Sequence, residues 1–70
     1  MTKIEAIQQM RAGIKMTHKY FSPEEWVTMK DEKLLFEDGV VCDPDEYWSW
    51  RENINWENDW SVYVIYPWLN

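Results

Sequence analysis

Apolar residues recur at helical spacing near the start of the chain. Within residues 3–12, Ile4, Ile7 and Met10 lie three residues apart, and polar side chains fill most of the remaining positions. Gly13 follows, at the position where helices commonly end in a left-handed residue. The pattern predicts a short amphipathic helix whose apolar stripe, widened by Ala6, belongs to the core.

The period changes from that of a helix to that of a strand after this glycine. Residues 14–21 alternate in character, which predicts a strand. One side carries Ile14, Met16, His18 and Tyr20, and the other carries Lys15, Thr17, Lys19 and Phe21.

Two acidic segments share a helix-start signature. In residues 22–25, SPEE, a serine N-cap precedes proline, and Glu25 completes a capping box. We expect only one turn here, because the residues that follow are extended again. In residues 43–46, DPDE, Asp43 is the expected cap and Glu46 returns to the cap amide. This second signature predicts a short helix through about Arg51.

The rest of the chain indicates strands. Residues 26–42 are expected to form a three-stranded antiparallel meander, with acidic residues at 31–32 in one turn and the hairpin signal Asp38-Gly39 in the next. A polar loop follows the second helix, and residues 60–66 alternate as a last strand that Pro67 ends. We expect one α+β domain over residues 1–70. In it an N-terminal helix packs on a small, mostly antiparallel sheet of four to five strands, and a short second helix precedes the last strand.

Composition adds a surplus of aromatic residues to this picture. A chain of 70 residues buries only about 60% of its unfolded surface, so its stability margin is thin. Cys42 is the only cysteine, which excludes an internal disulfide and fits a reduced compartment. Six tryptophans exceed what one small core holds, and we expect one or two to line a pocket or a subunit interface. They are Trp26, Trp48, Trp50, Trp56, Trp60 and Trp68.

The charge is acidic overall but unevenly distributed. The net charge of −6 argues against direct binding of nucleic acid, which needs a positive face. Residues 1–19 hold four basic residues against one acidic residue, a balance of +3, whereas residues 20–70 hold three against twelve, a balance of −9. The acidic part is either a solvated surface or a surface that imitates an anion. We expect a cytoplasmic protein, because no apolar run suits a membrane span or a signal peptide.

Reactive side chains are few. His18 is either a hydrogen-bonded structural residue or a phosphate contact assisted by Lys15 and Lys19. The serines lie outside any nucleophile motif, and the chain has no glycine-rich phosphate loop, so we expect neither an enzyme nor a bound cofactor. Helix capping explains Asp43 and its acidic neighbours, so we expect no metal site.

The second helix carries the most suggestive aromatic residues. Trp48 and Arg51 lie three apart, hence on one face, while Trp50 points elsewhere. An exposed tryptophan beside an arginine offers a stacking surface for a base and a guanidinium for a phosphate. The alternative is core packing, with Arg51 paired to Glu46 or Glu52.

The order of these features resembles that of small phage- and prophage-encoded proteins, and in outline the Thoeris anti-defence family of signal-sequestering proteins. The features are a helix ending in Gly13-x-Lys15, a strand with a basic position and then aromatics (His18, Tyr20, Phe21, Trp26), and a closing Asn58-Asp59-Trp60-Ser61-Val62. The resemblance implies an oligomer that holds cyclic nucleotide signals without cleaving them.

We therefore expect a phage-type inhibitor of bacterial immunity that sequesters a small cyclic nucleotide at the interface of a homodimer or a dimer of dimers. One alternative is an acidic protein-binding inhibitor, of the anti-CRISPR or DNA-mimic type, that acts on a host defence protein. The other is a phage accessory domain with a structural role. The expected ligand-binding residues are Lys15, His18, Lys19, Tyr20, Phe21, Trp26, Trp48, Trp50, Arg51 and Trp56.

Overall fold

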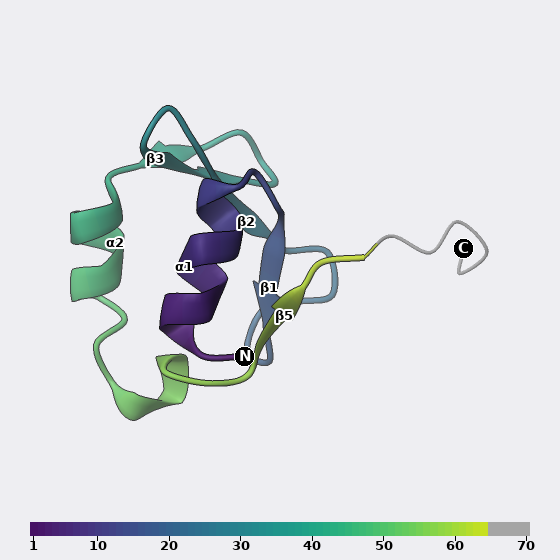
Figure 1. Ribbon diagram of the computed structural model, residues 1–70, viewed down its shortest axis with the longest axis vertical. Helices are drawn as coiled ribbons and strands as arrows, with labels where there is room; N and C mark the ends of the chain where they lie inside the picture. Colours follow the sequence, from purple (N-terminus) through teal and green to yellow (C-terminus); the bar gives the residue numbers. More distant parts are fainter. Residues whose placement is uncertain (65–70) are drawn as a thin grey trace.

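Residues 1–64 are described by a computed structural model, in which one five-stranded antiparallel sheet carries two helices (Figure 1). The strand order is β4-β3-β2-β1-β5, which places the last strand beside the first. This arrangement confirms the predicted α+β fold. The elements are α1 (Lys3–Arg11), β1 (Met16–His18), β2 (Val27–Lys30), β3 (Lys33–Phe36), β4 (Val41–Cys42), α2 (Pro44–Ser49), the 3-10 helix η1 (Ile54–Trp56) and β5 (Trp60–Val62).

Helix α1 begins with a capping box and ends at Arg11, shortly before the predicted glycine. The Thr2 hydroxyl accepts from the Glu5 amide, and the Glu5 carboxylate accepts from the Thr2 amide, which lowers the pKa of Glu5. Gly13 takes a φ of +85° just beyond the helix. Ala6 is buried, as expected, but Ile4 is 66% exposed, which corrects the predicted stripe. Two residues at 3.6 per turn place Ile4 nearly opposite Ala6.

The strand predicted over residues 14–21 is shorter in the structure. Only Met16–His18 pairs as β1, and Met16 and His18 are buried on one side, as the alternation predicted. The SPEE segment then forms one isolated turn, as expected. Its Glu25 amide donates to the Ser22 carbonyl, and the Ser22 amide donates to the Glu25 carboxylate.

The predicted meander is present as β2, β3 and β4. Lys30 faces Lys33 across a two-residue turn, whose residues Asp31 and Glu32 both have positive φ. The second turn places Gly39 at a φ of +86°, and the Gly39 amide donates to the Phe36 carbonyl.

Helix α2 differs from its prediction at both ends. Asp43 is the N-cap residue, but the predicted side-chain cap is wrong: Asp43 makes no cap hydrogen bond and instead accepts from the Lys33 ammonium at 2.6 Å. The ion pair with β3 outcompetes the local cap, because a cationic donor binds a carboxylate more strongly than an amide does. The helix ends at Ser49 rather than near Arg51.

The C-terminal strand also differs from its prediction. Residues 60–62 form β5, whereas Tyr63 and Val64 follow without strand assignment. Positions 65 and 66 of the predicted strand, the predicted stop at Pro67, and Trp68 lie outside the described residues.

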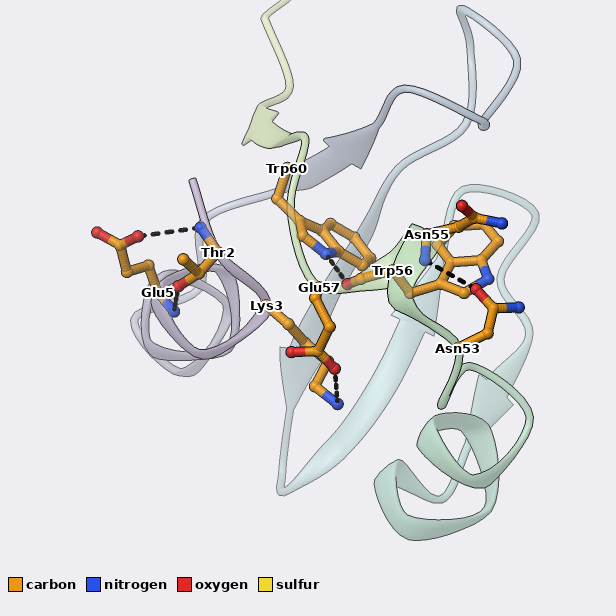
Figure 2. A network of polar contacts seen from close by, with 8 residues as sticks. All are labelled: Thr2, Lys3, Glu5, Asn53, Asn55, Trp56, Glu57 and Trp60. Atoms are coloured by element: carbon orange, nitrogen blue, oxygen red, sulfur yellow. Dashed lines mark hydrogen bonds and ion pairs between the residues drawn. The ribbon is translucent and has the colours of Figure 1, made fainter.

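The core lies between the sheet and the two helices. Buried residues of β1, β2, β3 and β5 contact Ala6 and Met10 of α1 and Tyr47 of α2. The loop before β5 is fastened to the start of α1, as Figure 2 shows. There the Lys3 ammonium lies 3.2 Å from a Glu57 carboxylate oxygen, and the Trp60 indole donates to the Trp56 carbonyl at 2.8 Å. The Lys3–Glu57 pair holds the start of the chain against this loop, and the indole hydrogen bond stays within the segment that leads into β5.

Candidate functional site

The two faces of the sheet differ in chemistry. Paired residues such as His18 and Trp60, or Met16 and Val27, point to one face, the inner face, which α1 and α2 cover. The alternate residues point to the other, outer face, and no other element of residues 1–64 packs there. The outer-face positions are Lys15, Thr17, Lys19, Trp26, Thr28, Lys30, Lys33, Leu35, Val41, Ser61 and Tyr63.

Lysines gather on this outer face although the protein is acidic. Four of the seven basic residues belong to it, and all four are exposed. Lys33 is paired with Asp43, whereas none of the other three takes part in an ion pair within residues 1–64. The outer face is therefore a basic surface on a molecule of net charge −6.

Aromatic rings lie beside two of these lysines. The Lys15 ammonium lies 4.4 Å from the centroid of the Trp26 ring, and Trp26 lies 6.5 Å from the Tyr63 ring. By alternation Lys19, just beyond β1, belongs to the same face, although its ammonium lies 5.7 Å from the Tyr20 ring at the edge of the sheet. We call Lys15, Lys19, Trp26 and Tyr63 the outer platform.

Side-chain hydrogen bonds position this platform. β1 and β2 pair only through Met16 and Val27. On either side of that pair, the Thr17 hydroxyl donates to the Glu25 carbonyl at 3.0 Å, and the Thr28 hydroxyl donates to the Ile14 carbonyl at 2.9 Å. These two bonds hold the strands together where backbone pairing is short, and so keep Lys15 next to Trp26.

His18 lies on the inner face, away from the platform. It is 3% exposed, its Nε2 lies 2.7 Å from the Asn58 carbonyl, and its Nδ1 accepts from the Tyr20 amide at 3.1 Å. The Trp56 and Trp60 rings lie 4.5 and 4.8 Å away. Of the two alternatives for His18, a hydrogen-bonded structural residue or a phosphate contact, this geometry corresponds to the first.

Four other predicted residues surround the same cluster. Three of them are partly buried against the core, and all three contact Trp60: Phe21, Trp48 and Trp56. Tyr20 is 55% exposed at its rim, with its ring 5.4 Å from His18. Phe21, Trp48 and Trp56 therefore contribute packing to the core.

Trp50 and Arg51 occupy a third location, at the end of α2. Trp50 is 64% exposed while Trp48 is half-buried, so the two tryptophans point in different directions, as expected. The Arg51 guanidinium carbon lies 4.4 Å from the Trp56 ring centroid and 5.2 Å from that of Tyr47. Within residues 1–64 Arg51 forms no ion pair, so neither Glu46 nor Glu52 takes the expected role.

The predicted residues thus fall into three groups: the outer platform, the His18 cluster and the end of α2. Sequence reasoning missed Tyr63, which completes the platform. Its alternation with Ser61, opposite Trp60 and Val62, was the available signal.

The described part of the chain carries neither a metal cluster nor a membrane helix. No three His, Cys, Asp or Glu side chains there are placed to hold a metal ion. None of its helices combines the length and the apolar character that a membrane span requires.

Comparison with known proteins gives no relative on which to base a function. No protein-family model, no curated protein and no solved structure matches this chain.

Proposed function

We propose that this protein binds a small cyclic nucleotide at the outer platform and sequesters it without cleaving it, as a phage-type inhibitor of bacterial immunity. The observation that carries the proposal is the contact of Lys15 with Trp26, beside Tyr63, on the uncovered basic face. The link to immunity rests on the resemblance to the signal-sequestering family.

The platform offers the two kinds of group that a nucleotide needs. A base stacks on an aromatic ring, which contributes about 1–3 kcal/mol per base in single-stranded nucleic acid complexes. The Lys15 ammonium already lies over the Trp26 ring and is free to turn to a phosphate when a base takes that place. Lys19, just beyond the other end of β1, supplies a second cation. Such groups hold a phosphate ester by charge and stacking.

A second copy of the chain completes this site in the proposal. An open sheet face contacts a ligand from one side only, and two such faces related by a two-fold axis enclose it and double the lysines. Partly exposed Leu35 and exposed Val41 on the outer face are suited to such an interface.

Calorimetry against cyclic dinucleotides, cyclic trinucleotides and cyclic ADP-ribose isomers tests the proposal. We expect binding of at least one ligand, and a loss of tenfold or more in affinity for Trp26→Ala, as expected from removing one stacked ring. Trp50→Ala removes an exposed tryptophan away from the platform and is the matched control. Mass spectrometry of the released ligand should find it intact.

Two results would oppose the proposal. One is the absence of heat and of any thermal shift with every ligand. The other is an equal loss of affinity for Trp26→Ala and Trp50→Ala, which would remove the platform as the site.

The protein-binding alternative has one observation in its favour. Asp31, Glu32 and Asp45 line, with Arg11 as the single basic residue, one cavity of about 580 Å³ between α1, α2 and the β2–β3 turn. An acidic surface of this kind suits a basic partner, and its complex should weaken steeply with added salt. Recovery of a host defence protein at low salt that is lost at high salt would support this alternative.

A further inference from the structure

A pocket of about 350 Å³ lies between the β3–β4 turn and the end of α2. We call it the α2 pocket. It is separate from the outer platform, since none of the platform residues lines it. Its lining residues are Glu25, Phe36, Glu37, Asp38, Val40, Cys42, Tyr47, Trp50 and Arg51.

Two polar atoms of this lining are buried without a partner. By distance and angle the Tyr47 hydroxyl and the Arg51 Nε have no hydrogen-bond partner within residues 1–64, although the Arg51 guanidinium lies close enough to this hydroxyl to lower its pKa. Tyr47 is only 5% exposed. A buried polar atom left unpaired is destabilising and uncommon in native proteins. Two such atoms in one pocket indicate a place for an acceptor from outside the chain.

Both atoms are donors held in place by their surroundings. Burial raises the pKa of the Tyr47 hydroxyl, against the opposing effect of the Arg51 guanidinium, so this hydroxyl keeps its proton. The Arg51 guanidinium carbon lies 4.4 Å from the centroid of the Trp56 ring, which restricts its movement. Both atoms are covered in the structure, so an acceptor oxygen reaches them only when the wall of the pocket shifts.

The other residues that line the pocket favour a ligand that has an apolar part and a positive charge. Phe36, Val40 and Trp50 present apolar surface, and Val40 and Trp50 are exposed. Glu25, Glu37 and Asp38 bring three carboxylates against the single charge of Arg51. A simple anion is disfavoured by this balance, whereas a ligand that also carries a cation is favoured.

We propose that the α2 pocket binds a small zwitterion with an apolar side chain, of the α-amino acid class. Its carboxylate accepts from Tyr47 and Arg51, its ammonium group donates to the pocket carboxylates, and its side chain contacts Phe36, Val40 and Trp50. The proposal does not rest on the nucleotide function, because it uses another surface and other residues.

Cys42 supplies a local reporter for this pocket. It is the only cysteine of the chain, it is partly exposed, and it lines the pocket. A bound ligand should slow alkylation of Cys42 by iodoacetamide, and a ligand on the outer platform should not.

The probes are L-phenylalanine and L-leucine, with derivatives that remove one charge each. N-acetyl-L-phenylalanine lacks the ammonium group, and L-phenylalaninamide lacks the carboxylate. We expect saturable protection of Cys42 by at least one of the two amino acids, and affinities at least tenfold weaker for both derivatives. A hydrogen bond to a charged group is worth enough to give such a factor.

Substitutions then assign the contacts. Tyr47→Phe and Arg51→Lys should each weaken binding about tenfold, while Tyr20→Phe and Arg11→Lys, away from the pocket, should leave it unchanged. Tyr47→Phe deletes only a hydroxyl group, so we expect this variant to fold. If Arg51→Lys does not fold, the binding affinity of Tyr47→Phe alone tests the proposal.

Three outcomes would overturn the proposal. They are no protection of Cys42 by either amino acid, equal protection by the N-acetyl derivative, and unchanged binding by Tyr47→Phe. None of them bears on Trp26 or on nucleotide binding.

Discussion

Tyr47 shows how one buried atom affects both stability and binding. Its hydroxyl has no partner in residues 1–64, and burial raises its pKa above the ordinary value of 10.0. A residue that is unfavourable for the fold and faces a pocket is typical of a functional position, because selection for stability alone would favour phenylalanine.

At neutral pH we expect Tyr47→Phe to be as stable as the unmodified chain, or more stable by up to about 1 kcal/mol. The substitution removes an unsatisfied buried hydroxyl and keeps the ring that packs on Phe36. Urea unfolding followed by circular dichroism measures the difference. A loss of more than about 1 kcal/mol would indicate that the hydroxyl has a partner after all.

At alkaline pH the same substitution should have a larger effect. The folded-state pKa of Tyr47 lies above its unfolded value, so the folded chain binds this proton more tightly. The resulting stability is fully present below pH 10 or so and is lost as the pH rises through the folded-state pKa. Unfolding between pH 9 and 11 should therefore show a steeper fall for the unmodified chain than for Tyr47→Phe.

At the scale of elements, the β2–β3 turn carries avoidable strain. Asp31 and Glu32 have φ of 53° and 65° in a two-residue hairpin turn. Two positive φ angles define the turn that asparagine and glycine favour. Asp31 and Glu32 also line the neighbouring cavity.

We expect Glu32→Gly to raise stability by roughly 0.5–1 kcal/mol, because glycine takes this conformation without strain. Gly39→Ala should have the opposite effect on stability. A methyl group at this position would meet no atom within 4 Å, but the φ of +86° is unfavourable for alanine. It should lower stability by about 1 kcal/mol through backbone strain alone. Urea midpoints that move in the reverse directions would contradict this account of both turns.

At the scale of the whole molecule, Trp60 joins the parts of the chain. It pairs with His18 across β1 and β5, donates to the Trp56 carbonyl, and contacts the Phe21 and Trp48 rings. Trp60→Ala should reduce stability by about 3–5 kcal/mol, enough to unfold a domain of this size. Trp50→Ala should change it by less than about 1 kcal/mol. A cooperative thermal transition in Trp60→Ala would refute the central role of this residue.

Assembly is a property of the whole molecule as well. We expect light scattering at micromolar concentration to show a dimer or a dimer of dimers, and the nucleotide to favour it by neutralising the facing lysines. Leu35→Asp, on the outer face, should reduce the mass. A strict monomer with and without nucleotide would exclude the shared site and favour the protein-binding alternative.

Local patterns in the sequence were sufficient to predict the two α-helices, the strands and their order along the chain, but not the 3-10 helix η1, which lies in the expected polar loop. The helix at Lys3–Arg11, its glycine stop, the SPEE turn and the meander each depend on residues within a few positions of one another. Periodicity, capping and turn chemistry act over that same range, so they can be read without knowing the fold.

The tertiary structure alone decided which residues meet. β5 lies beside β1, so Asn58 and Trp60 enclose His18 from about forty positions away, and Tyr63 joins Trp26. The Asp43 carboxylate could accept a hydrogen bond from a nearby helix amide or from the ammonium of Lys33, ten residues earlier. In the structure it accepts from Lys33. Contacts of this kind depend on strand order and on competition between partners. Strand order and the choice between competing partners depend on the free energy of the whole fold. They therefore leave no periodic signal in the sequence.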